Sequence, residues 1–574
     1  MPKKYLLNIT AFFLFVAAFG QKDAAYSNLT NGIGTEGVYV HYNTNLLFSG
    51  EYLNFKLYAL SKINQSLSTA SKMAYVELLD ESGERKIIQK VKLIDGMGQG
   101  DIFIPTNLDS GYYTLVAYTA YMKNWSTETF YSDELIILNP YTNDQEIFWG
   151  DKSLSGNNAS GSTGTITDTS LELVLNKALF GTREKVELEL VPTSNYKGNY
   201  SISVRKVYKD LDYGERTSPR DYTKKFTAID PNPTGAEHLP ELRGEIIKGE
   251  ISSKDGLETT NKKVVFSLPG EAYEYRMVST DSDGVFMFSL DSENLDTESL
   301  FQVWGADKEH YSVTIDDVPE IKYANKTSKH FVLDREMKDV IEKRSTHNQI
   351  ENAYFNSKPD TVLINNNFIP LYGKRFFEYV LDEYTRFPTF RETLVEIVDN
   401  AWIANNDDGK QNIFVRDFEA TNMDVGYSPL VIVDGIVIQE HEDLINYDIK
   451  RVKAIRIARD QFVVGGQIFQ GVFDVETFDA DFAANYQKGY LYGIELLRPE
   501  PQKKYFKQDY SSDRFAEIPD FRHQLLWQPN FALEDSTIAL EFYTSDLEGE
   551  FEVVVEGFTE QMQPVKVVKR FNVQ

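Results

Sequence analysis

The chain has 574 residues, no cysteine and a formal net charge of −28 at pH 7. A length of this size suggests about three to five domains, and 42% hydrophobic with 13% aromatic residues excludes general disorder. The negative charge disfavours nucleic acid and anionic lipid surfaces as partners, and the absence of cysteine excludes disulfides, thiol nucleophiles and thiolate metal sites.

The first twenty residues have the three parts of a secretory signal. Lys3 and Lys4 form a positive start, residues 5–19 are largely apolar, and the small residue Gly20 precedes the expected mature end at Gln21. A membrane-spanning helix needs about 20 apolar residues, which neither this run nor any later one reaches. We therefore expect a signal peptide at 1–20, an exported protein, and no transmembrane segment of its own.

Residues 36–139 show short alternating apolar and polar runs separated by turn residues such as Ser49-Gly50 and Asp95-Gly96. Regularly spaced runs of this kind predict a β-sandwich. Three segments in this range resemble the macroglobulin domain of the MG2 kind: VYVHYN, SGEYLNFKLYAL and SGYYTLVAYTAYMKNW. That resemblance implies an immunoglobulin-like sandwich.

A polar Gly/Ser/Thr-rich stretch at 140–170 predicts a flexible linker. Residues 171–208 then contain further strand patterns, interpreted as a small β-domain that is also macroglobulin-like. Residues 209–240 are charged and rich in proline, and they are expected to form a loop.

A β-sandwich is expected at 241–335, where STDSDGVFMFSL resembles the carboxypeptidase regulatory-like domain. Asp281, Asp283 and Gly284 within it suggest a calcium loop. The later ligands of such a loop are missing, so a hairpin turn is the preferred interpretation.

Residues 338–358 are polar and partly helical in composition, which indicates a connector. Residues 374–400 carry apolar positions at helical spacing on both sides of Pro388, which predicts two helices. PLVIVDG at 429–435 and DIKRVKAIRI at 448–457 then resemble the plug domain of TonB-dependent transporters. No array of membrane-length strands follows, so 361–497 is expected to be an α+β domain without a barrel.

The last segment, 498–574, is expected to be a terminal β-sandwich, and it contains IPDFRHQLLWQPNF. The order of these four kinds of segment resembles an exported multi-domain family of Bacteroidota. The predicted fold class is mainly β: tandem β-sandwich (immunoglobulin- or macroglobulin-like) domains plus one small α+β plug-like domain.

Motifs for catalysis are missing from the sequence. The seven histidines form no HExxH pattern, and no GxSxG elbow, phosphate-binding loop or dinucleotide fingerprint occurs. We therefore expect no enzyme, no catalytic residue, no cofactor and no metal. The many carboxylates leave a hydrolase with paired acids open as a less favoured alternative.

Two aromatic residues that follow a predicted strand, Tyr121 and Trp125, are weak candidates for a binding surface. The resemblance to plug domains implies an outer-membrane β-barrel protein, or other envelope proteins, as partners, with no nucleic acid. The expected function is a non-catalytic scaffold or accessory subunit of an outer-membrane protein complex, in the periplasm, at the outer membrane or at the cell surface. The alternative is a carbohydrate- or polymer-binding protein.

Overall fold

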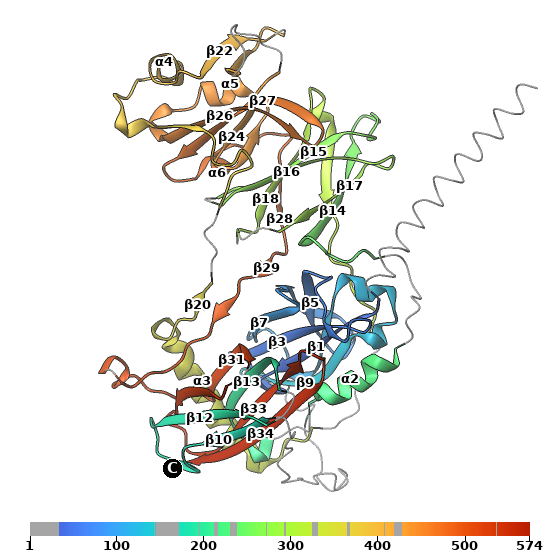
Figure 1. Cartoon of the computed structure of the whole chain (residues 1–574), viewed down its shortest axis with the longest axis vertical. Helices are drawn as coiled ribbons and strands as arrows, with labels where there is room; N and C mark the ends of the chain where they lie inside the picture. The colour runs from blue at the N-terminus through green and yellow to red at the C-terminus, as the bar shows by residue number, and fades with distance from the viewer. Residues whose placement is uncertain are drawn as a thin grey trace, which may run out of the picture. The chain divides into compact units, whose positions relative to one another are not determined.

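The computed structural model describes residues 34–142, 144, 148, 171–193, 196–211, 216–229, 238–270, 272–291, 294, 296–323, 331–363, 368–406, 408–417, 427–511, 513–534 and 536–574. The predicted signal peptide and nearly all of the predicted linker lie outside these residues. The chain divides into two compact units: unit 1 comprises 1–242, 320–363 and 500–574, and unit 2 comprises 243–319 and 364–499. Strands dominate both units (Figure 1), which confirms the predicted mainly β fold class.

Unit 1 begins with a sandwich of two sheets, here called the N-terminal sandwich. Its buried aromatic side chains include Tyr39, Phe55 and Tyr118, each fully inaccessible. The alternation predicted at 36–139 produces these strands because apolar side chains on one face of each strand meet the facing sheet. One sheet contains β1 (Glu36–Tyr42), β3 (Tyr52–Ser61), β4 (Ser66–Leu67) and β7 (Met97–Phe103), and the other β2 (Leu46–Phe48), β9 (Tyr131–Leu138), β8 (Gly111–Tyr118), β5 (Met73–Leu79) and β6 (Arg85–Lys92).

A second sandwich of unit 1, the C-terminal sandwich, is built from two segments far apart in the sequence. Teal strands from 171–206 and red strands from 524–573 pair within common sheets (Figure 1). The prediction of separate domains at 171–208 and 498–574 is thus corrected, because strands from both segments are hydrogen-bonded within each of the two sheets and neither segment forms a sheet by itself. The sheets are β10 (Leu171–Leu175), β12 (Lys185–Pro192) and β32 (Ile538–Tyr543), and β11 (Leu179–Phe180), β34 (Pro564–Val573), β33 (Gly549–Thr559), β13 (Gly198–Lys206) and β31 (Gln524–Leu533).

Two helices of unit 1 depart from the sequence predictions. The expected loop at 209–240 contains α2 (Pro219–Ala228), which Ser218 caps by accepting from the backbone N–H of Asp221. The expected connector is α3 (Lys338–Ala353), and its Arg344 and Asn348 are buried against β2 and the turn that follows it. Both helices are therefore packed parts of unit 1. Short strands β20 (Thr361–Val362) and β30 (Lys503–Lys504) pair beside α3, and β29 (Pro499–Glu500) lies where the chain leaves unit 2.

Unit 2 contains a third sandwich, called the unit 2 sandwich. The Asp281 side chain accepts hydrogen bonds from the backbone N–H groups of Asp283 and Val285, each at 2.9 Å. These bonds close a hairpin turn, which is the interpretation preferred from the sequence of this segment. One strand of the sandwich, β28, comes from within the predicted plug-like range. The sheets are β17 (Val285–Leu290), β14 (Glu245–Ser253) and β19 (Tyr311–Ile315), and β16 (Glu274–Ser279), β15 (Lys263–Leu268), β18 (Glu298–Trp304) and β28 (Tyr492–Glu495).

The rest of unit 2 is an α/β assembly, called the mixed module. Its main sheet has the order β21 (Phe377–Val380), β26 (Val452–Val464), β27 (Gln467–Thr477), β24 (Leu430–Val433) and β25 (Ile436–Ile438). A hairpin of β22 (Ala401–Asn405) and β23 (Gln411–Val415) and the helices α4 (Phe390–Glu396), α5 (His441–Ile445) and α6 (Phe482–Asn485) accompany it.

The prediction of the first of two helices at 374–400 is wrong. Phe377 to Val380 form strand β21, which pairs with β26, while the second predicted helix exists as α4. Four residues cannot establish a helical or a strand period by themselves, so the neighbouring strand β26 decides their conformation.

Candidate functional sites

The two predicted contact residues are buried. Tyr121 is 2% and Trp125 is 8% exposed, and their rings pack edge to face with centroids 5.2 Å apart. They lie in and directly after the short helix η1 (Ala120–Asn124), which folds back on the N-terminal sandwich. The expectation that they form an accessible binding surface is therefore corrected.

A cluster with the residue types of a hydrolytic triad lies between the two sandwiches of unit 1. Nδ1 of His41 is 2.6 Å from the hydroxyl of Ser201, and Nε2 of His41 is 3.9 Å from a carboxylate oxygen of Glu556. Ser201 and His41 are fully inaccessible, and burial lowers the pKa of His41 to about 3. A nucleophile must reach its substrate, so this cluster joins two sandwiches and does not form an active site.

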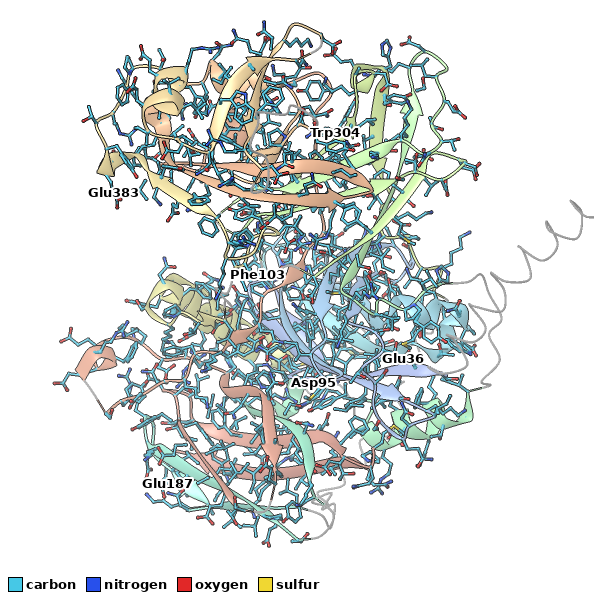
Figure 2. All side chains as sticks on the ribbon, turned by 45° about the horizontal axis from the view of Figure 1, so that its top comes forward. Glu36, Asp95, Phe103, Glu187, Trp304 and Glu383 are labelled. Atoms are coloured by element: carbon cyan, nitrogen blue, oxygen red, sulfur yellow. The ribbon has the colours of Figure 1, made fainter. Side chains whose placement is uncertain are left out.

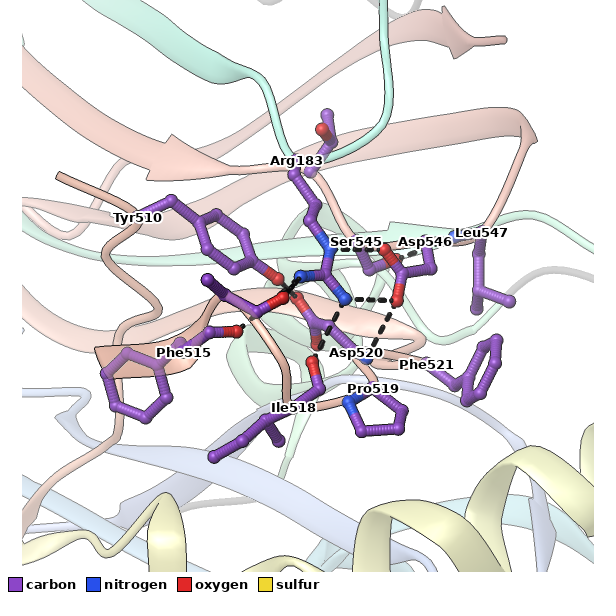
Figure 3. A network of polar contacts seen from close by, with 12 residues as sticks. Arg183, Tyr510, Phe515, Ile518, Pro519, Asp520, Phe521, Ser545, Asp546 and Leu547 are labelled. Atoms are coloured by element: carbon purple, nitrogen blue, oxygen red, sulfur yellow. Dashed lines mark hydrogen bonds and ion pairs between the residues drawn. The ribbon is translucent and has the colours of Figure 1, made fainter. Parts of the chain in front are cut away.

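A second polar network fastens a loop to the C-terminal sandwich (Figure 3). The guanidinium of Arg183 binds both oxygens of Asp546 at 2.6 and 2.8 Å and donates to the carbonyls of Ala516 and Ile518. The ring of Tyr510 lies under it, with its centroid 5.2 Å from the guanidinium carbon. All N–H donors of the Arg183 guanidinium are bonded within the protein, so the network has a structural role.

In unit 2, both faces of the five-stranded sheet of the mixed module are covered. One face packs on α4, α5 and α6 around Leu394, Leu444 and Phe482. The other face packs on the unit 2 sandwich, where Leu430 and Phe469 contribute to one apolar cluster with residues of β15 and β16. Trp304, labelled in Figure 2, packs edge to face on Phe469 at this junction, with ring centroids 5.5 Å apart.

The same junction contains a buried carboxylate. The hydroxyls of Tyr273 and Tyr372 donate to one oxygen of Asp474 at 2.7 and 2.5 Å. Burial raises the pKa of Asp474, although these two hydrogen bonds oppose the shift. Two tyrosines on a buried acid form a specific polar contact that holds the sandwich and the mixed module in one arrangement.

The two edges of this sheet differ. At the β25 edge, the backbone of Val437 is bonded to side chains of the sandwich: its carbonyl accepts from Gln302 and its N–H donates to Ser267. At the other edge, β21 pairs with β26 and with no other strand among the residues that the structure describes. Within the described residues, the outer side of the β21 backbone is thus the open edge of the sheet.

Large apolar side chains are exposed in β21 and in the segment that precedes it in the sequence. Phe377, in β21 itself, is 42% exposed, and Ile369 and Leu371 shortly before it are 59% and 57% exposed. The sequence analysis missed this surface because it assigned a helix to these residues. In β21, Phe377 and Glu378 are exposed and Tyr379 is buried, a pattern of four residues that is too short to identify the strand from the sequence.

No helix in the described ranges is long and apolar enough to cross a membrane. Within those ranges, histidine, aspartate and glutamate side chains also form no group that would hold a metal ion.

No protein-family model and no curated protein matches the sequence. Among solved structures, alpha-2-macroglobulin from Salmonella reacted with methylamine aligns over 94% of this chain with 8% identity and a TM-score of 0.24. Alpha-2-macroglobulin from Escherichia coli activated by porcine elastase aligns over 94% with 7% identity and a TM-score of 0.24. The chain covers 40% and 44% of the lengths of these two proteins. A tetra-tandem repeat from the extending region of a large adhesion protein aligns over 50% of this chain and 74% of its own, with 12% identity and a TM-score of 0.13.

Proposed function

We propose that this protein is exported and acts without catalysis, as a scaffold or accessory subunit of an outer-membrane protein complex that works through protein–protein binding. The observation that carries the proposal is the open edge at β21. Both faces of its sheet are covered and its opposite edge is capped, so β21 is the place where another polypeptide reaches the sheet. An unpaired strand edge offers a row of backbone donors and acceptors to an added strand.

The partner is expected to supply an extended segment with apolar side chains. Backbone hydrogen bonds to β21 would provide affinity, and contact with the exposed side chain of Phe377 in the same strand would provide apolar burial. Because the sheet faces are occupied by the chain's own elements, we propose that a barrel protein, or another envelope protein, binds this edge from outside.

The test is site-specific photocrosslinking in the native bacterium. A photoreactive phenylalanine analogue at position 377 is expected to crosslink to one envelope protein in the outer-membrane fraction. Val395 on α4 and Met287 on β17 are 76% and 49% exposed and serve as matched control positions. Crosslinks from the control positions alone, or a protein that fractionates away from the envelope, would contradict the proposal.

A further inference from the structure

Unit 1 contains a cleft of about 250 Å³ that the proposed function does not use. Its walls come from the N-terminal sandwich (β3 and β7), from α3 and the short helix η8 (Phe355–Ser357), from the C-terminal sandwich (β13 and β31), and from the segment that follows β30. Four parts of the chain that are distant in sequence therefore meet around one space. The cleft is partly open to solvent, so a ligand has access to it.

The cationic groups of the lining, and its carboxylates other than Asp360, are paired with one another or with nearby groups of the protein. Arg344 holds both oxygens of Glu51 at 2.8 and 2.7 Å, and Lys503 holds both oxygens of the lining residue Asp101 at 3.1 and 3.0 Å. Lys358 likewise binds Glu351 at 2.7 Å. A charged ligand would have to break such pairs and leave a partly buried charge without its partner, which is costly. The lining therefore favours an uncharged ligand.

Several uncharged polar groups of the lining lack a partner. The hydroxyl of Tyr52 and the side-chain amide of Asn54 make no hydrogen bond to any residue that the structure describes. Polar groups that line a partly open cleft without a protein partner can exchange hydrogen bonds with the hydroxyl groups of a ligand.

One carboxylate is suited to receive ligand hydroxyls. A single oxygen of Asp360 accepts the backbone N–H of Phe506 at 2.8 Å. Burial raises the pKa of Asp360, and the charge of Asp101 contributes in the same direction. The part of the lining around Asp360 and Asp101 therefore disfavours a negatively charged ligand. The second oxygen of Asp360 is available to accept hydrogen bonds from ligand hydroxyl groups.

Aromatic rings complete the lining. The rings of Tyr52 and Phe355 are nearly parallel, with an interplanar angle of 11° and centroids 6.1 Å apart, and Phe355 is 46% exposed. Tyr505 and Phe506 line the same cleft. Flat apolar faces next to amide, hydroxyl and carboxylate groups match a ring that has C–H groups on its face and hydroxyls around its edge.

We propose that this cleft binds an uncharged saccharide unit of a glycan. Its volume is below the roughly 300 Å³ at which pockets for drug-sized ligands begin, which suits one or two sugar rings, with the rest of the glycan in solvent. The site lies in unit 1 and is independent of the β21 edge.

The test uses the full mature chain and a panel of neutral, acidic and amino-sugar oligosaccharides, with an extended peptide library as a separate arm. Binding is measured by calorimetry and by tryptophan fluorescence, because Trp527 lines the cleft. We expect a neutral oligosaccharide to bind, and Asn54→Ala and Phe355→Ala to weaken it on the order of tenfold each, as for contacts worth more than about 1 kcal/mol.

Phe103→Ala is the matched control. Phe103 is a similarly exposed phenylalanine (44%). Its ring is tilted against the ring of the lining residue Tyr52, with centroids 5.1 Å apart, but Phe103 itself is not part of the lining. Its replacement should leave affinity within about twofold, and near-UV circular dichroism should show all three variants folded. Binding restricted to charged glycans or to peptides, no neutral binder in the panel, or equal effects of the three substitutions would each overturn the proposal.

Discussion

Glu556 is a buried carboxylate that keeps its charge. It is 2% exposed, accepts a hydrogen bond from Tyr39 at 2.6 Å, and lies 3.2 Å from the amino group of Lys566. Burial by itself would raise its pKa, but Lys566, His41 and Arg216 together hold it at about 2. The charge of Glu556 is thus stabilised by the fold, and it joins the N-terminal and C-terminal sandwiches.

We predict that Glu556→Gln destabilises unit 1 by about 3 to 5 kcal/mol at pH 7, because a buried carboxylate is lost and two partly buried cations, Lys566 and Arg216, lose their partner. The folded pKa of about 2 lies below the ordinary value of 4.5. The contribution of Glu556 is therefore complete above pH 4.5 and is lost as the pH falls from about 4.5 to 2. Urea unfolding of both forms at pH 7 and pH 3 should show the difference shrinking at pH 3.

Glu541→Gln is the control for this prediction. Its carboxylate is 59% exposed and pairs with Lys185 on the surface. Exposed pairs contribute at most about 1 kcal/mol, so this variant should unfold close to the wild type at both values of pH. A Glu556→Gln difference that stays constant between pH 7 and pH 3 would argue against a charged Glu556.

At the scale of single elements, packing partners decide both conformation and accessibility. Strand β21 has a helix-like sequence context but pairs with β26, and η1 turns the aromatic side chains of Tyr121 and Trp125 inward. The loop 515–522 has little regular structure, yet Arg183 holds it through its carbonyls and through Asp546. Local sequence describes none of these partners.

We predict that Arg183→Ala loosens the loop 515–522 and lowers the stability of unit 1 by about 2 kcal/mol, since several charge-assisted hydrogen bonds are lost. Arg183→Lys should retain only part of the stabilisation that Arg183 provides, because an ammonium group cannot form two parallel hydrogen bonds to the carboxylate of Asp546. Hydrogen exchange at 515–522 measures the loosening directly.

Lys177→Ala provides the comparison in the same sandwich. Lys177 is 53% exposed and pairs with Glu184 on the surface, so its removal should leave exchange at 515–522 unchanged. If Lys177→Ala and Arg183→Ala accelerate exchange equally, the network drawn in Figure 3 is not what fastens the loop.

At the scale of the whole molecule, the chain passes repeatedly between two units, and each unit has cores of its own. Unit 1 is closed by residues 500–574, which complete a sandwich begun at 171. Each unit therefore requires segments that are distant in sequence, and a cut at a predicted domain boundary would remove strands from a shared sheet.

We predict two thermal unfolding transitions, one for each unit. Phe551→Ala should lower the free energy of unfolding of unit 1 alone, and Phe473→Ala that of unit 2 alone. Each loss is expected to be about 3 to 5 kcal/mol, as for the deletion of a large core side chain, and should lower the midpoint temperature of one transition only. Scanning calorimetry combined with proteolysis and fragment identification assigns the transitions. A single transition that both substitutions shift would show that the units unfold together.

The mainly β architecture and most strand positions follow from the sequence, because a period of two and turn residues act locally. The hairpin at Asp281 and helix α4 are of this kind: the side chain that makes the turn or cap lies within a few residues of the backbone groups that it binds. The missed helix α2 also had local signals, namely Ser218 as a cap, Pro219 at the first turn, and Tyr222 with Phe226 one turn apart.

By itself, then, the sequence determined strand content, turns, net charge and the absence of thiol chemistry, since each depends on residue type or on near neighbours. Only the tertiary structure decided that 171–206 and 524–573 share one sandwich, that Tyr121 and Trp125 are buried, and that β21 is the open edge of its sheet. The cleft around Tyr52 and Trp527 likewise exists only where four distant segments meet. The physical reason is that burial and strand pairing are properties of contacts between distant residues, and local patterns do not specify which distant residues meet.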